Sequence, residues 1–156
     1  MRNGWTFWLL IVALVVLHFV LHLSLGLGPW APDLLTLAVL LGARQLPAGS
    51  AAGVGFVVGL LGDAVSLSAF GAGAITQTVL GYLGARSRDL FVGESLLFLT
   101  LYLFLGAWVQ NALYYGVAEG VRRGEPLQTL LLYAPLEAAY VALAGLVAML
   151  VYRTLR

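Results

Sequence analysis

The stretch GSAAGVGFVVGLLGDAVSLSAFGAGAITQTVLGYLG, residues 49 to 84, decides the fold of this chain. It consists of two short apolar runs that are rich in glycine and separated near the middle by an aspartate. Each run carries a set of small or polar residues at helical spacing: Gly55, Gly59, Gly62 and Asp63 in the first, and Gly73, Gln77, Gly81 and Gly84 in the second. Such faces let helix backbones approach closely, which stabilises helix pairs in lipid. We therefore expect these two segments to form the packed centre of a helical bundle.

The composition of the whole chain predicts an integral membrane protein. Of its 156 residues, 62% are hydrophobic and only 10% are charged, whereas a soluble domain has about 25% charged residues. No polar stretch of domain size follows the first apolar run, so this run reads as a retained helix and not as a cleaved signal peptide. The absence of cysteine excludes disulfides and thiolate chemistry, and a net charge of +1 provides no basic face for nucleic acid.

We predict an all-α fold with six transmembrane helices in a single domain, 1–156, with no soluble domain. The approximate spans are 5–25, 32–46, 49–63, 69–85, 91–117 and 127–152. The second, third and fourth spans hold only about 13 to 16 apolar residues, and such helices reach roughly 20 to 24 Å across a core of about 30 Å. They must thin the bilayer or lie inside the bundle. A re-entrant hairpin over residues 49–85 is the alternative, and we favour two short crossings.

The arginines predict the orientation. Six spans place both termini on one side of the membrane. That side then carries Arg2, Arg44, Arg86, Arg88, Arg153 and Arg156, and the other carries only Arg122 and Arg123. Because basic residues are retained on the cytoplasmic side, we expect both termini to be cytoplasmic, in a multi-pass protein of the bacterial inner membrane.

Polar side chains within the predicted spans are the candidate functional residues, because a polar group in hydrocarbon is costly. Glu137 is expected about ten residues into the last span. His18, His22 and Gln110 are expected at a similar depth and could pair with it. We favour a buried glutamate that fixes the register of the helices, and substrate contact or proton relay is the alternative.

Three other features allow two interpretations each. His18 and His22 have the i, i+4 spacing of metal ligands, but no third ligand is near in the sequence, so we favour a structural pair. Asp63 is either a helix-end carboxylate that accepts hydrogen bonds from backbone N–H groups or a contact for a partner. The glycine-rich runs lack a Walker lysine, so we interpret them as packing faces and not as nucleotide loops.

No catalytic constellation is apparent in the sequence. Ser66 and Ser68 have no histidine partner nearby, and no GxSxG elbow occurs. We therefore expect a protein that is not an enzyme and that binds no metal or cofactor.

Two segments carry a resemblance to a known family. PDLLTLAVLLGAR, residues 32 to 44, is a second span that starts with proline. In residues 49 to 86, a glycine-rich segment ends in Leu-Leu-Gly-Asp, and a Phe-Gly turn leads to a span that closes on Gly-Tyr-Leu-Gly. With these motifs the chain resembles the MreD family of bacterial rod shape-determining proteins.

The resemblance implies a noncatalytic scaffold of the cell-elongation machinery, the elongasome, which supports peptidoglycan synthesis and cell shape. Its partners would be MreC and, indirectly, MreB and RodA with its class B penicillin-binding protein, all at the lipid bilayer. Pairing with a second copy of the chain as a homodimer stays open.

The family's fold is similar to the substrate-binding subunits of energy-coupling factor transporters, and this similarity supplies the alternative function, a small-molecule (vitamin) binding subunit. Such subunits would be expected to carry an Ala-x-x-x-Ala docking pattern in the first span. Here Ala13 is the sole alanine between Trp5 and Leu25, so the docking pattern is missing and we favour the scaffold.

Overall fold

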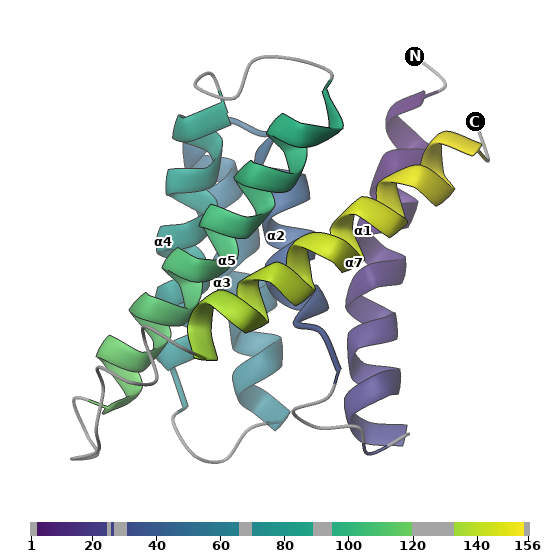
Figure 1. Ribbon diagram of the computed structural model, residues 1–156. Helices are drawn as coiled ribbons and strands as arrows, with labels where there is room; N and C mark the ends of the chain where they lie inside the picture. The colour runs from purple at the N-terminus through teal and green to yellow at the C-terminus, as the bar shows by residue number, and fades with distance from the viewer. Residues whose placement is uncertain are drawn as a thin grey trace.

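Every regular element in the described part of the chain is a helix. The structure is a computed structural model, and it describes residues 3–24, 26, 31–65, 70–88, 95–119 and 133–154. Its elements are α1 (Asn3–Phe19), a π-helical turn η1 (Val20–Ser24), α2 (Leu34–Ala43), α3 (Ala48–Val65), α4 (Ala72–Ser87), α5 (Leu96–Glu119) and α7 (Ala134–Thr154) (Figure 1).

Successive described helices run in alternate directions, so the start of α1 and the end of α7 lie at the same end of the bundle (Figure 1). A hydrogen bond of 3.3 Å between the hydroxyls of Thr6 and Tyr152 joins the two helices there. The rings of Phe7 and Tyr152 also meet edge to face, with centroids 6.0 Å apart. We refer to this end as the basic end, because the described arginines lie there, and to the opposite end as the cleft end, because a polar cleft described below opens there.

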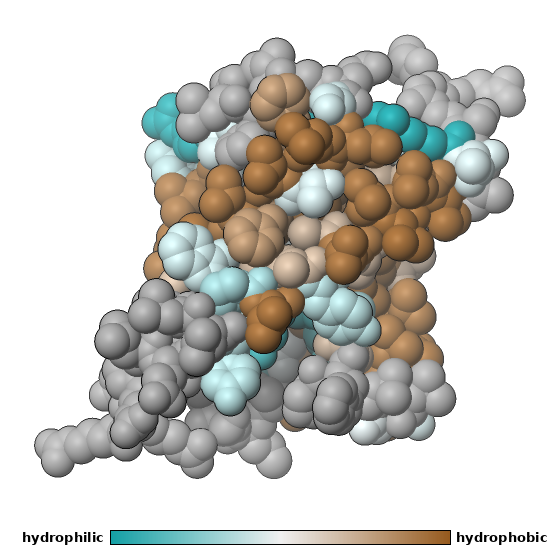
Figure 2. Space-filling model, in the orientation of Figure 1, coloured by the Kyte–Doolittle hydropathy of each residue, from teal (hydrophilic) through white to brown (hydrophobic). Residues whose placement is uncertain are grey.

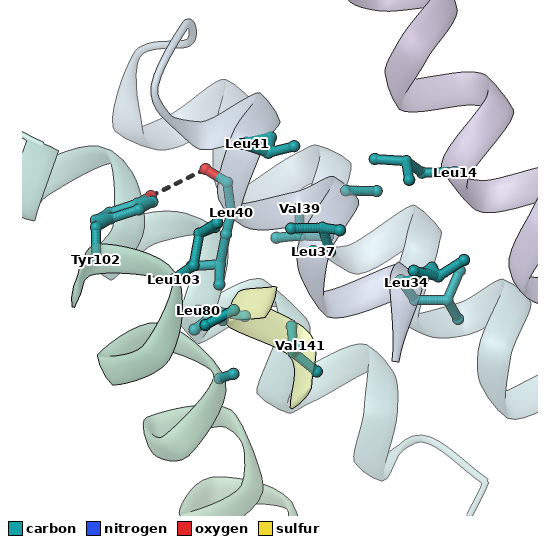
Figure 3. Close-up of a cluster of buried hydrophobic side chains, with 14 of the residues drawn as sticks. Leu14, Leu34, Leu37, Val39, Leu40, Leu41, Leu80, Tyr102, Leu103 and Val141 are labelled. Atoms are coloured by element: carbon teal, nitrogen blue, oxygen red, sulfur yellow. Dashed lines mark hydrogen bonds between the residues drawn. The ribbon is translucent and has the colours of Figure 1, made fainter. Parts of the chain in front are cut away.

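Helix α2 is the centre of the bundle. All ten of its residues are buried, and α1, α3, α4, α5 and α7 all contact it. Figure 3 shows its leucines surrounded by Leu80 of α4, Leu103 of α5 and Val141 of α7. A helix that is apolar on all sides is stable only where protein or lipid surrounds it, and α2, which carries a single polar residue, Thr36, is surrounded by protein. The expectation that α3 and α4 form the centre is therefore wrong, because those two helices pack on α2.

The glycine faces do bring α3 and α4 together, in the most extensive interface between two helices of the bundle. A Cβ atom at Gly55 would overlap the carbonyl oxygen of Gln77, and one at Gly59 would overlap that of Gly73. On α4, a Cβ at Gly81 would overlap the carbonyl oxygen of Ala51. Backbone lies against backbone at each of these points, so no larger side chain fits.

The other glycines of the two faces have different neighbours. Gly62 faces Leu35 of α2, and Gly84 faces Tyr102 of α5 as well as Ala43 of α2. Gly73 lies against the carboxylate of Asp63. The helical spacing of the glycines therefore correctly predicts close helix contacts, but it does not indicate which helix each glycine contacts.

Among the described helices, four are long and apolar enough to cross a membrane: Gly4–Ser24, Ala48–Val65, Leu96–Ala118 and Ala134–Thr154. Helix α3 has 18 residues and is longer than the span predicted for it. Helices α2 and α4 have 10 and 16 residues and are shorter. An enclosed helix need not match the bilayer, because protein and not lipid surrounds its ends, which accounts for the short length of α2.

Candidate functional site

A polar cleft of about 340 Å³ opens at the cleft end of the bundle. Residues of α1, η1, α2, α3, α4, α5 and α7 line it, and Figure 2 shows pale and teal side chains gathered in the lower middle of the molecule, below a brown apolar band. All six polar residues singled out in the sequence lie in its lining: His18, His22, Asp63, Gln77, Gln110 and Glu137. Residues from five different helices are therefore brought to one place.

Asp63 caps helix α4. Its carboxylate accepts hydrogen bonds from the backbone N–H groups of Gly71 (3.0 Å), Gly73 (3.0 Å) and Ala74 (2.8 Å). Gly71 precedes the helix with a φ of +95°, a conformation that glycine adopts without steric cost. The negative charge also complements the positive end of the helix dipole. Of the two interpretations of Asp63, the helix-end carboxylate is the one that this geometry matches.

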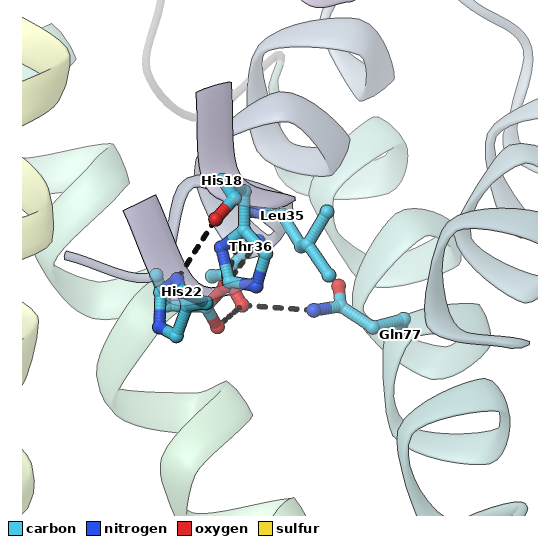
Figure 4. Close-up of polar contacts among 6 residues, drawn as sticks. His18, His22, Leu35, Thr36 and Gln77 are labelled. Atoms are coloured by element: carbon cyan, nitrogen blue, oxygen red, sulfur yellow. Dashed lines mark hydrogen bonds and ion pairs between the residues drawn. The ribbon is translucent and has the colours of Figure 1, made fainter. Parts of the chain in front are cut away.

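Asp33, Thr36 and Gln77 form a chain of hydrogen bonds. Asp33 caps α2 by accepting from the N–H groups of Leu35 and Thr36, at 3.1 and 3.2 Å. The Thr36 hydroxyl donates to the other carboxylate oxygen of Asp33 and accepts from the Gln77 amide Nε2 at 2.8 Å. Figure 4 shows the side chain of Gln77 reaching from α4 to the hydroxyl of Thr36 on α2. The chain ties the first turn of α2 to the middle of α4.

Gln110 and Glu137 have different partners, although the sequence suggested that they could pair with each other. The Gln110 amide Nε2 donates to the hydroxyl of Thr76 at 3.0 Å. Glu137 accepts from the side chain of Asn111 at 3.0 Å. This bond joins α5 to α7 at the mouth of the cleft.

Glu137 lies near the described start of α7. Helix α7 begins at Ala134, so Glu137 lies in its first turn and is exposed. Pro135 also lies in the first turn of α7, where the N–H that proline lacks is not needed for a bond within the helix. A carboxylate in a first turn also favours the positive end of the helix dipole. Residues 127–132 of the predicted span, together with Ser66 and Ser68, lie outside the described residues.

His18 and His22 stack on each other, with ring centroids 4.0 Å apart. The His22 Nδ1 lies 2.9 Å from the carbonyl oxygen of His18 and donates to it, while the His18 Nδ1 is 3.8 Å from a carboxylate oxygen of Asp33. A π-helical turn carries His22 and brings its ring over that of His18 (Figure 4). Within the described ranges no group of three histidine, aspartate or glutamate side chains is placed to hold a metal ion.

Charge is distributed unequally between the two ends of the bundle. The described arginines, Arg44, Arg86, Arg88 and Arg153, follow or end helices at the basic end, where Arg88 donates to the carbonyl oxygen of Leu46 at 3.1 Å. Asp33, Asp63 and Glu137 lie at the cleft end. The cleft is therefore an acidic and hydrogen-bonding site, separated from the basic end by the leucine core.

Sequence reasoning missed six polar residues of the lining: Asp33, Thr36, Asn111, Tyr114, Tyr115 and Tyr140. Asp33 and Thr36 have the i, i+3 spacing of an N-cap pair, which signals a role at the start of α2. Asn111 follows Gln110 directly, but neighbours in a helix point about 100° apart, so the sequence does not indicate that both reach the same cleft.

The fold and the cleft define the class of protein: an all-helical chain with several helices apolar and long enough to cross a membrane, and with a polar site at one end. Comparisons with known protein families, with curated proteins and with solved structures find no match to this chain.

Proposed function

We propose that this chain is an MreD-type scaffold of the bacterial cell-elongation machinery, without catalytic activity, that binds MreC within the inner membrane. The observation that carries the proposal is the contact between two of the motifs on which the resemblance rests. The aspartate of Leu-Leu-Gly-Asp, Asp63, caps the helix that follows the Phe-Gly turn at Phe70 and Gly71. Residues from these two motifs are thus joined by hydrogen bonds at the start of α4.

The bundle suits such a role because it offers an apolar surface to other helices. Large apolar side chains are exposed along α1, α3, α5 and α7, while the polar groups are gathered in the cleft. Helix α1 makes its principal contact with α2 and leaves most of its surface uncovered. In lipid, partner helices bind through close packing and a few polar contacts of about 0.6 to 2 kcal/mol each, so a stable complex needs several of them.

Six crossings with both termini in the cytoplasm agree with the positive-inside rule. All the described arginines lie at the basic end, together with the starts of α1 and α5. If α2 and α4 both cross the membrane as short helices, that end faces the cytoplasm and the cleft opens on the outer side.

A small-molecule binding subunit of an energy-coupling factor transporter is the second candidate, and the polar cleft is the observation that favours it. The two candidates predict different companions. A scaffold brings MreC and the RodA complex with it, whereas a transporter subunit brings paired ATPases and a bound vitamin.

The test is affinity purification of the tagged chain from its native membranes in mild detergent, with bound proteins and small molecules identified by mass spectrometry. We expect MreC in stoichiometric amount, with MreB, RodA and its penicillin-binding protein in smaller amounts. A tagged membrane protein of similar size and unrelated fold is the control for nonspecific capture. Paired ATPases with a vitamin, or the absence of MreC from a folded preparation, would contradict the scaffold.

A further inference from the structure

Two buried glutamines in the cleft wall each have an unused hydrogen-bond acceptor. Gln77 and Gln110 are only 4% exposed. Their side-chain oxygens have no hydrogen-bond partner among the described residues, and the same holds for the Nδ1 atom of His18. Buried polar atoms in native proteins are nearly always paired. Three unsatisfied atoms around one cleft therefore indicate that something binds there.

The hydrogen-bond chains fix which atom of each glutamine is left over. The hydroxyl of Thr36 donates its only proton to Asp33, so it can only accept from Gln77. The hydroxyl of Thr76 donates to the carbonyl oxygen of Ala72 at 2.9 Å, so it can only accept from Gln110. Both amides must therefore direct their NH₂ groups to threonine. Each leaves a carbonyl oxygen, and a molecule bound here must bring N–H or O–H donors.

The charge around the cleft favours a cation. Asp33 and Glu137 both lie in its lining and are both accessible. The carboxylate of Asp63 adds a third negative charge, although backbone N–H groups satisfy it. No basic side chain other than histidine is among the described lining residues. A positive ligand would relieve this excess of negative charge.

Aromatic rings complete the lining. Tyr114, Tyr115 and Tyr140 all border the cleft, and the faces of tyrosine rings attract cations, most strongly when water is excluded. A volume of about 340 Å³ lies within the range of small-molecule sites. The cleft volume limits the size of a ligand, and the tyrosine rings favour a positive charge on it.

We propose that the cleft binds a small organic cation that carries N–H donors, such as a primary ammonium group on a short aliphatic chain. Its ammonium supplies the donors that the oxygens of Gln77 and Gln110 lack, and Glu137 and Asp33 balance its charge. The same chemistry occurs in free amines and in the headgroup of phosphatidylethanolamine. This inference does not depend on the proposed scaffold function.

The test measures binding of 1,4-diaminobutane to the purified full-length chain in phosphatidylcholine nanodiscs, by calorimetry and by the shift in thermal unfolding temperature. We expect saturable binding of the diamine. Two analogues should each bind at least about tenfold more weakly. They are the uncharged 1,4-butanediol and the diamine in which both nitrogens are fully methylated to quaternary ammonium groups, which keeps its charge but has no N–H donor. Equal binding of either analogue, or no saturable binding of the diamine, would overturn the proposal.

Variants test the residues. Gln110→Met and Gln77→Met should each weaken diamine binding by about tenfold, while Gln45→Met, at an exposed glutamine of the basic end, should leave it unchanged. Glu137→Gln keeps the bond from Asn111 and removes only the charge at an exposed site, so it stays informative if the buried variants do not fold. Wild-type binding in the folded variants would contradict the site.

Lipid composition distinguishes the two sources of the ammonium group. If the headgroup is the natural occupant, nanodiscs that contain phosphatidylethanolamine will show weaker diamine binding, because the lipid competes for the cleft. If a free amine is the occupant, binding will be the same in both lipids. If the wild-type chain binds the diamine but captures no MreC, the scaffold function alone is refuted. If it captures MreC but does not bind the diamine, this inference alone is refuted.

Discussion

The carboxylate of Asp63 accepts a hydrogen bond of 3.0 Å from the backbone N–H of Gly73, and a Cβ atom at position 73 would overlap that same carboxylate. The end of α3 and the start of α4 thus depend on a charged residue and a glycine together. This pairing joins the last turn of α3 to the start of α4.

Asp63→Ala should destabilise the chain by about 2 to 3 kcal/mol, because three N–H groups at the buried start of α4 lose their acceptor. Asp63→Asn should cost less, since its amide oxygen still accepts but the charge is lost. Thermal unfolding in mild detergent, followed by circular dichroism, measures both. Ser50→Ala, at an exposed position of α3, is the control and should unfold as the wild type does. An unchanged unfolding temperature in Asp63→Ala would show that the cap contributes nothing.

Gly59→Leu should disrupt the α3–α4 interface. A Cβ atom alone would already overlap the backbone of α4, and overpacking of this kind costs about 1 to 3 kcal/mol or more. Gly53→Leu on the same helix is the matched control, because nothing lies within 4 Å of a Cβ at that position. Both variants can be compared by the fraction that remains monodisperse after extraction from the membrane. Equal recovery of the two would contradict the close contact of the backbones.

Leu37→Ala tests whether α2 is the centre of the bundle. Leu37 is 0% exposed, and truncation of a fully buried leucine costs about 2 to 5 kcal/mol. Leu143→Ala on α7, where the leucine is 58% exposed, should change stability by only a few tenths of a kcal/mol, because lipid surrounds that side chain. The difference in unfolding temperature between the two variants is the measurement. Similar small losses in both would place α2 outside the core.

The sequence was sufficient to predict the helices, the small residues at their contacts and the six polar side chains that reach the cleft, because each depends on local spacing and on the cost of a polar group in lipid. It was not sufficient to predict the central position of α2. Leu34 to Ala43 looks the same whether lipid or protein surrounds it, since both are apolar. The partner of Glu137 was also missed, because Asn111 and Gln110 differ only in the direction in which each points from α5.

The orientation in the membrane can be tested with single cysteines, since the chain has none of its own. Gln45→Cys places a thiol at the exposed basic end, and Ser24→Cys places one at the exposed cleft end. If the positive-inside rule sets the topology, a maleimide that cannot cross membranes will label position 24 in intact spheroplasts and position 45 only after permeabilisation. The cysteine-free wild type is the control for background labelling. The opposite pattern would place the cleft on the cytoplasmic side. Labelling of both positions in intact spheroplasts would show that the residues after α2 and the end of η1 lie on the same side of the membrane.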